Sequence, residues 1–134
     1  MDKTFIDKLA YIEIQDKKIL VTMSHGKDRW YIPGGKHEGN ETDQEALIRE
    51  VKEELTVDLK PETIKYYGTF EAQAHGRPEG TIVRMTCYTA DYDGTLQPSS
   101  EIEKIDFFRY DQKDQTSLVD ELIFADLKKK ELLL

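Results

Sequence analysis

The feature that most constrains this chain is a glycine turn followed by an acidic helix, within residues 35–57. A capping-box pair, Thr42 and Glu45, precedes apolar residues that recur at every fourth position, so the pattern predicts a helix over residues 42–55. Three glutamates lie at i, i+3 and i+4 on this helix, with Cβ atoms about 5–6 Å apart; they are Glu50, Glu53 and Glu54. Such a cluster of like charges is costly unless a cation lies among them.

The position of these glutamates on the predicted helix indicates a ligand rather than solvent. At 100° per residue they lie beside the apolar arc centred on Val51, so they border the core where a cleft would open. They also lie in the last two turns, where the macrodipole favours cations by about 0.3–1 kcal/mol each. The alternative, a solvated acidic face, would require interleaved bases at the same angles. We therefore predict a divalent metal with oxygen ligands, Mg²⁺ together with a substrate phosphate.

The same stretch resembles the signature of the Nudix hydrolase superfamily, Gly-x5-Glu-x7-Arg-Glu-U-x-Glu-Glu-x-Gly-U, in which U is a bulky aliphatic residue. Thr56 departs from this pattern, because it stands where the family has the glycine that ends the helix. The spacing is long and fixed, and the resemblance covers residues 30–57 when the lead-in is included. The positions that match are Gly35, Glu41, Arg49, Glu50, Val51, Glu53, Glu54 and Val57.

The order of the expected elements indicates a mixed α+β fold in one domain, residues 1–134. The chain of 134 residues is long enough for one modest core, and no linker or repeat divides it. A second amphipathic helix is expected over residues 117–130, and strands over residues 5–14, 18–23, 30–32, 64–74, 81–90 and 102–110. The resemblance implies an α/β/α sandwich with a mixed central sheet and two main helices, of the small MutT type.

Charge and composition exclude several classes of function. The net charge of −8 argues against binding along a nucleic-acid backbone, and no apolar run is long enough to cross a bilayer. The lone cysteine, Cys87, suits a reducing compartment, and the absence of an export signal favours a cytoplasmic location. We therefore expect a small-molecule nucleotide as partner, with neither a nucleic-acid polymer nor a membrane. Many relatives dimerise, so a homodimer stays open.

The resemblance implies a role for each charged group of the signature. Glu50 is the expected general base in MutT-type members, although other members place the base on a later loop. Arg49 is expected to hold a neighbouring carboxylate by forked hydrogen bonds, which lysine could not make. The predicted catalytic residues are Arg49, Glu50 and Glu53. The predicted metal ligands, for Mg²⁺ with Mn²⁺ as a substitute, are the Gly35 carbonyl, Glu50, Glu53, Glu54 and an outside carboxylate, with Glu101 as candidate and Glu103 and Glu79 as competitors.

The substrate-binding residues are the least constrained by sequence. Trp30 and Phe107 are candidates to line a slot for a nucleobase, and Arg77 and Arg84 are candidates to contact phosphate. ADP-ribose-cleaving relatives usually have a proline where this chain has Ala72. By elimination, the favoured activity is Mg²⁺-dependent hydrolysis of a nucleoside triphosphate to the monophosphate and pyrophosphate. Two alternatives stay open: cleavage of nucleoside-diphosphate sugars or ADP-ribose, and a non-catalytic nucleotide-sensing domain.

Overall fold

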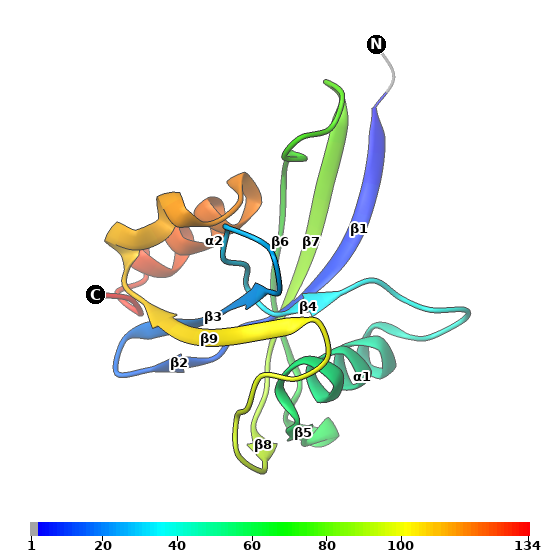
Figure 1. Ribbon diagram of the computed structural model, residues 1–134, viewed down its shortest axis with the longest axis vertical. Coiled ribbons are helices and arrows are strands. Elements are labelled where there is room, and N and C mark those ends of the chain that lie inside the picture. Colours follow the sequence, from blue (N-terminus) through cyan, green and yellow to red (C-terminus); the bar gives the residue numbers. More distant parts are fainter. Residues whose placement is uncertain (1–2) are drawn as a thin grey trace.

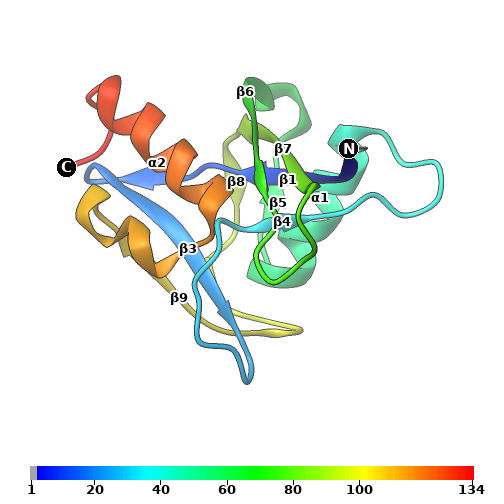
Figure 2. The ribbon, with the colours of Figure 1, turned by 90° about the horizontal axis from the view of Figure 1, so that it is seen from above.

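Two helices flank a mixed sheet, as the sequence predicts. The structure is a computed structural model that describes residues 3–134; residues 1 and 2 of the predicted domain lie outside the described part. Helix α1 (Asp43–Leu55) and helix α2 (Leu118–Lys129) lie on either side of the strands, which the view from above shows most clearly (Figures 1 and 2). The arrangement is therefore an α/β/α sandwich.

The main sheet has the strand order β4-β1-β7-β6 and mixes parallel with antiparallel pairs. Strand β1 (Thr4–Tyr11) runs parallel to β7 (Thr81–Thr89). On the outer sides, β4 (Gly34–Gly35) pairs antiparallel with β1, and β6 (Lys65–Gln73) pairs antiparallel with β7. The free ends of β1, β6 and β7 extend beyond the body of the molecule (Figure 1).

Two smaller sheets complete the structure. One joins the strands β2 (Ile14–Gln15), β3 (Lys18–Ser24) and β9 (Ile102–Phe108), all antiparallel. The other pairs β5 (Asp58–Leu59) with β8 (Tyr92–Asp93). Strand β5 follows α1 in the chain and lies beside it (Figure 1). Because β8 pairs with β5, the segment after β8 lies near the carboxyl end of α1.

Apolar side chains form one core on each side of β1. Because successive residues of a strand point to opposite faces, Leu9 and Tyr11 pack toward α1, whereas Ala10 packs toward α2. Each fully buried leucine or isoleucine contributes about 1.5–3 kcal/mol relative to an exposed one. The helical residues that supply the two cores are Leu47, Val51 and Leu55 from α1, and Ile123, Phe124 and Leu127 from α2.

Helix α1 begins at the predicted capping box and ends before Thr56, the residue that replaces the glycine of the signature. The Thr42 hydroxyl accepts from the Glu45 N–H at 3.1 Å, and the Glu45 carboxylate accepts from the Thr42 N–H at 2.9 Å, so the capping box is confirmed. At the other end Thr56 adopts φ 63°, and its N–H donates to the Lys52 carbonyl at 3.1 Å. Thr56 therefore makes the left-handed turn that glycine makes more easily.

The strand predicted over residues 30–32 is wrong. Only Tyr31 forms a bridge, with Thr22, while the regular pairing moves to β4. The N–H groups on either side bond elsewhere: that of Trp30 donates to the Gln115 carbonyl at 3.0 Å, and that of Ile32 donates to the Asp120 carboxylate at 3.2 Å. Partners distant in sequence thus take the hydrogen bonds that a strand would need.

Two predicted strands are shorter than expected. The first divides into β1 and β2, and the last ends at Phe108. After Phe108 the chain forms a 3-10 helix, η2 (Tyr110–Gln115), because the Arg109 N–H donates to the Gln112 side chain at 2.9 Å. A second 3-10 helix, η1 (Pro61–Thr63), precedes β6.

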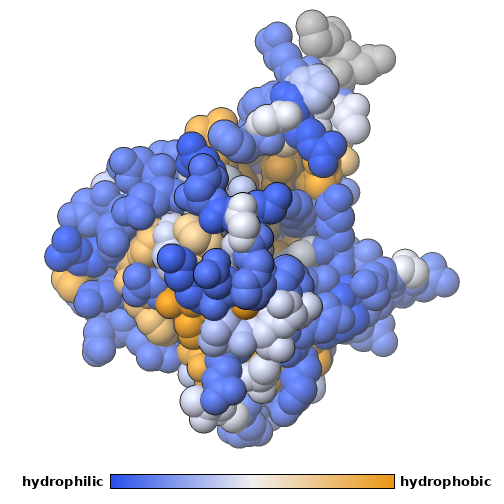
Figure 3. All heavy atoms as spheres, viewed as in Figure 1, coloured by the Kyte–Doolittle hydropathy of each residue, from blue (hydrophilic) through white to orange (hydrophobic). Residues whose placement is uncertain are grey.

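The face seen in Figure 3 is largely hydrophilic, and its apolar atoms show in patches, some beside the projecting strands and others over the body around β3 and β9. Within residues 3–134, no helix is both long and apolar enough to span a bilayer.

Candidate active site

The glycine turn and α1 are fixed against each other through β1. The pairs Leu9–Gly35 and Ala10–Gly34 hold the turn on the edge of the main sheet, while α1 is anchored on the face of that sheet by its buried apolar residues. A Cβ atom on Gly35 would lie 2.5 Å from the Glu50 carboxylate, and one on Gly34 would lie 1.9 Å from the Leu9 carbonyl oxygen. Glycine at position 34 therefore lets the turn lie against the backbone of β1, and a side chain at position 35 would displace the Glu50 carboxylate.

Three carboxylates converge beside this turn. Glu50, Glu54 and Glu101 each offer an oxygen, and these oxygens all lie within 4.8 Å of one another; we call them the carboxylate cluster. Glu101 comes from the segment before β9, whose N–H groups donate to the carbonyls of Glu54 and Leu55 at 3.0 Å. Carbonyls at a helix end lack intrahelical partners. The segment that brings Glu101 thus also completes the end of α1.

The surroundings of Glu54 disfavour an isolated anion. Its side chain is nearly buried, with 7% exposed, and accepts one hydrogen bond from the Gly34 N–H at 3.1 Å. Burial is the main cause that raises the pKa of Glu54 to about 8, and the neighbouring Glu50 and Glu101 act in the same direction. Burial also raises the pKa of Glu50, against the effect of Arg49. A cation between these groups would stabilise their charged forms.

Arg49 connects the turn, the start of α1 and the carboxylate cluster. Its Nε and Nη2 atoms donate to the two oxygens of Glu41 at 2.7 and 2.9 Å, and Nη1 donates to Glu50 at 2.8 Å. Nη2 also donates to the Lys36 carbonyl at 2.9 Å. The hydrogen bond from Arg49 is the main reason that the pKa of Glu41 falls to about 2. The structure thus places the forked hydrogen bond of Arg49 on Glu41.

The remaining predicted acids lie outside the cluster. The Glu53 side chain is 48% exposed, and its carboxylate lies 3.4 Å from Arg49 rather than with the other three glutamates. Of the three candidates for the outside carboxylate, Glu101 is brought to the cluster; Glu79 and Glu103 are not part of it in the described chain.

A cavity of about 180 Å³ leads away from the cluster. Gly34, Gly35 and Glu54 line one part of it, and Asp120 at the start of α2 lines another. The Asp120 side chain is completely buried; one oxygen accepts from the Ile32 N–H, and the other has no partner among the described residues. Burial raises the pKa of Asp120 to about 7. A buried carboxyl with a free oxygen is suited to bind a polar edge of a ligand.

Sequence reasoning missed Asp120, although one signal was available. It lies among Val119, Ile123 and Phe124, so it is an acid on the apolar side of an amphipathic helix. Buried carboxyl groups are rare without a partner or a function.

The four predicted substrate-binding residues are dispersed. Arg77 lines a second cavity, of about 200 Å³, which adjoins the first. Trp30 packs against Phe108, with ring centroids 5.2 Å apart, and Phe107 packs into the core beneath α1. The Arg84 guanidinium lies over the Phe5 ring and is held by two carboxylates, Asp7 and Glu71. Of the four residues, only Arg77 lines either cavity.

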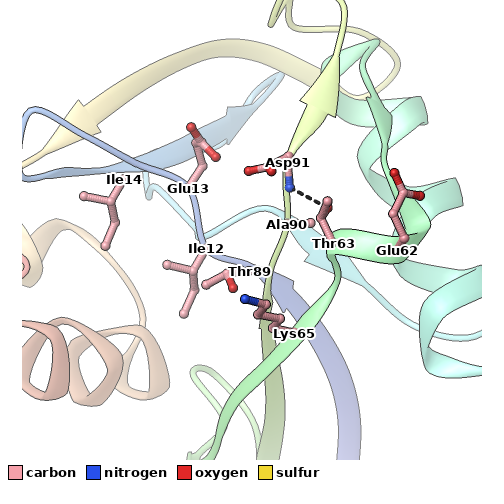
Figure 4. A pocket seen from close by; sticks show the side chains of 9 residues that line it. All are labelled: Ile12, Glu13, Ile14, Glu62, Thr63, Lys65, Thr89, Ala90 and Asp91. Atoms are coloured by element: carbon pink, nitrogen blue, oxygen red, sulfur yellow. Dashed lines mark hydrogen bonds between the residues drawn. The ribbon is translucent and has the colours of Figure 1, made fainter.

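A larger cavity, of about 470 Å³, lies elsewhere (Figure 4). It opens beside the link between β1 and β2, opposite η1, where the Asp91 N–H donates to the Thr63 hydroxyl at 2.8 Å. None of its lining residues belongs to the carboxylate cluster. Size alone therefore does not select a candidate site, and the converging carboxylates favour the smaller cavity that Glu54 lines.

Comparison with known proteins identifies the family of this chain. The NUDIX domain model matches residues 9–126. The chain is 31% identical over 97 residues to the CTP pyrophosphohydrolase of Escherichia coli, covering 69% of this chain and 67% of that protein. It is 39% identical over 59 residues to the 8-oxo-dGTP diphosphatase of Proteus vulgaris, covering 44% of this chain and about half, 48%, of that relative.

A solved structure extends the similarity to the whole fold. The solution structure of the E. coli ORF135 protein superposes with a TM-score of 0.74 at 23% identity, covering 96% of this chain and 92% of that one. At this identity the match concerns the fold, and it supports the three-layer arrangement described above.

Proposed function

This chain belongs to the NUDIX domain family, and from that premise we propose that it hydrolyses a nucleoside triphosphate to the nucleoside monophosphate and pyrophosphate, with Mg²⁺ as cofactor. The observation that carries the proposal is the carboxylate cluster, whose member Glu54 lines a cavity that also contains Asp120, a buried carboxyl group with one oxygen unpaired among the described residues. The part of the cavity near Glu54 fits a metal-bound polyphosphate, and the part near Asp120 fits the polar edge of a nucleobase.

The cluster has the chemistry that a hard divalent cation requires. All of its ligand atoms are oxygens, and burial together with mutual repulsion disfavours three anions there without a cation. Glu50, Glu54 and Glu101 would hold the ion, with the Gly35 carbonyl and Glu53 as further candidates; Mn²⁺ would substitute. The bound ion would neutralise phosphate oxygens and orient the attacking water.

The side chains around the ion divide the remaining tasks. Glu50 is the proposed general base, because it lies in the cluster with a raised pKa and would accept the proton of the attacking water. Arg49 is the proposed positioning residue, since its hydrogen bond to Glu50 leaves the second Glu50 oxygen for water or metal. Asp120 and the backbone near Ile32 would contact the nucleobase of the substrate.

The names of the relatives support a nucleotide as substrate. One is a CTP pyrophosphohydrolase and another an 8-oxo-dGTP diphosphatase; for this chain we propose the shared class, a nucleoside triphosphate. The single domain and the cytoplasmic location stay predictions, and so does the absence of a nucleic-acid or membrane partner.

A nucleotide screen tests the proposal. Wild-type protein and a Glu54→Gln variant would be incubated with Mg²⁺ and a panel of standard and oxidised nucleoside triphosphates, nucleotide sugars and ADP-ribose, with monophosphate and pyrophosphate quantified. We expect turnover of at least one triphosphate and a loss of more than about 100-fold in the variant. Cleavage restricted to nucleotide sugars or ADP-ribose would replace the proposed substrate, and binding without turnover would favour a sensor.

A further inference from the structure

The cleft beside the carboxylate cluster has a second half with the opposite charge. The cavity of about 200 Å³, here called the basic cavity, is lined by Lys8, Lys36, His75 and Arg77 among apolar and uncharged side chains. It shares Lys8, Tyr31 and Met85 with the cavity that reaches Glu54, so the two adjoin. No aspartate or glutamate of the described chain lines it. In a protein with net charge −8, this is a local reversal of charge.

The lysine and arginine side chains of this cavity form no close ion pair within the described chain. Within residues 3–134, no ion pair of 4.0 Å or less includes Lys8, Lys36 or Arg77. Burial and then the nearby Lys36 lower the pKa of Lys8; Arg77 acts in the same direction, and Asp120 and Glu54 oppose it. Cations that are close enough to repel one another favour an anion between them.

Helix α2 adds to this positive potential. Ser117, Leu118 and Val119 line the cavity at the first turn of the helix. The first N–H groups of a helix have no intrahelical acceptor and carry a partial positive charge. Here they reinforce a charge that the side chains already supply.

We propose that the basic cavity is a phosphate subsite, which binds a phosphate group of the nucleotide other than the two joined by the bond that is cleaved. The inference rests on the proposed function, which places the cleaved linkage at the carboxylate cluster. Two parts of a nucleotide carry such a group: the end of the 5′ chain, and a ribose hydroxyl that is itself phosphorylated. Lys8, on the wall shared by both cavities, and Arg77, on the rim, would donate charge-assisted hydrogen bonds to either.

Binding without turnover tests the subsite. Dissociation constants would be measured by calorimetry for a nucleoside 5′-monophosphate, its 3′,5′-bisphosphate and its α,β-methylene triphosphate analogue, in a guanosine and a cytidine series. Wild type would be compared with Lys8→Met and Arg77→Gln, and with Arg109→Gln as a matched loss of charge on a distant surface. The bisphosphate carries one more phosphate than the monophosphate, and the triphosphate analogue carries two more. We expect the ligand whose added phosphate reaches the subsite to bind wild type about tenfold or more tightly than the monophosphate, and each cavity variant to lose most of that gain.

The pattern of losses identifies the source of the phosphate. If the cavity variants lose the gain in affinity only for the triphosphate analogue, the subsite binds the end of the 5′ chain. If they lose it only for the bisphosphate, the subsite binds the phosphate on the ribose. Equal weakening of all three ligands, or an unchanged gain in both variants, would overturn the proposal. Hydrolysis is assayed separately, so a protein that cleaves no triphosphate but loses the gain in these variants would refute the proposed function and retain the subsite.

Discussion

At the scale of single residues, Asp120 carries the clearest electrostatic signature outside the carboxylate cluster. It is completely buried, its pKa is about 7, and one oxygen has no partner among the described residues. Below about pH 7 the folded protein therefore favours the protonated form, whereas the unfolded chain ionises near the ordinary pKa of about 3.9. The stability linked to the neutral carboxyl is complete below that value and is lost as the pH rises through about 7.

The Asp120→Asn variant isolates this effect, because asparagine keeps an acceptor for the Ile32 N–H and cannot ionise. We predict that the stability of wild type relative to Asp120→Asn falls between about pH 4 and pH 7, by at most about 1.4 kcal/mol per pH unit. Urea unfolding at a series of pH values measures the difference. Parallel stability curves for the two proteins would show that Asp120 is ionised in the folded state.

Arg49 offers a second residue-level prediction, about geometry rather than charge. Its guanidinium donates to Glu41, Glu50 and the Lys36 carbonyl at once. Lysine keeps the charge but cannot make the planar fork. We expect Arg49→Lys to lower kcat about 10–100-fold with a small change in KM, as for other residues that orient a metal ligand. Steady-state kinetics with the best substrate of the screen decides; an unaltered kcat would remove the positioning role.

At the scale of elements, the end of α1 contains a residue under strain. Thr56 has a positive φ of 63°, where a Cβ atom is unfavourable and glycine is the usual residue. We predict that Thr56→Gly stabilises the protein by about 0.5–1 kcal/mol, since relief of strain outweighs the added freedom of the unfolded chain. Denaturant unfolding measures the change. Thr56→Ala is the control, because it also removes the hydroxyl but keeps the Cβ atom; an equal gain in both variants would locate the effect in the hydroxyl.

Elements that depend on local signals are predictable from the sequence, and those that depend on distant partners are not. The capping box at Thr42 fixes the start of α1, and apolar periodicity fixes its buried face. The strand expected over residues 30–32 fails because the N–H groups of Trp30 and Ile32 bond to Gln115 and Asp120, which lie far along the chain. Two-residue strands such as β4 carry no periodicity, so only the pairing partner defines them.

At the scale of the whole molecule, the same distinction between local signals and distant partners applies to the candidate active site. The residues of the signature lie close in sequence, so the spacing alone gathers Glu50 and Glu54. Glu101 joins them from a segment that docks on the end of α1, and the resemblance was needed to choose it over its competitors. The spacing did not reveal that Glu53 is outside the cluster, nor that Lys8 and Asp120 line cavities beside it, because these facts depend on tertiary packing.

Metal binding should stabilise the molecule as a whole, because unfolding disperses the three carboxylates. At a free Mg²⁺ concentration of 100 times the dissociation constant, the expected gain is about 2.7 kcal/mol. We predict that Tm rises with Mg²⁺ in wild type and changes little in Glu54→Gln. Thermal unfolding in Mg²⁺ and in chelator measures both, and a similar rise in the variant would assign the effect to a different site.

The most direct measurement is the location of the metal itself. Crystals grown with Mn²⁺ and a non-hydrolysable nucleoside triphosphate analogue, with anomalous diffraction data collected at the manganese edge, would place the ion without ambiguity. We expect a manganese peak within bonding distance of Glu50, Glu54 and Glu101, with the ion also in contact with the polyphosphate. Analogue bound in the cleft with no manganese peak between these three carboxylates would contradict it.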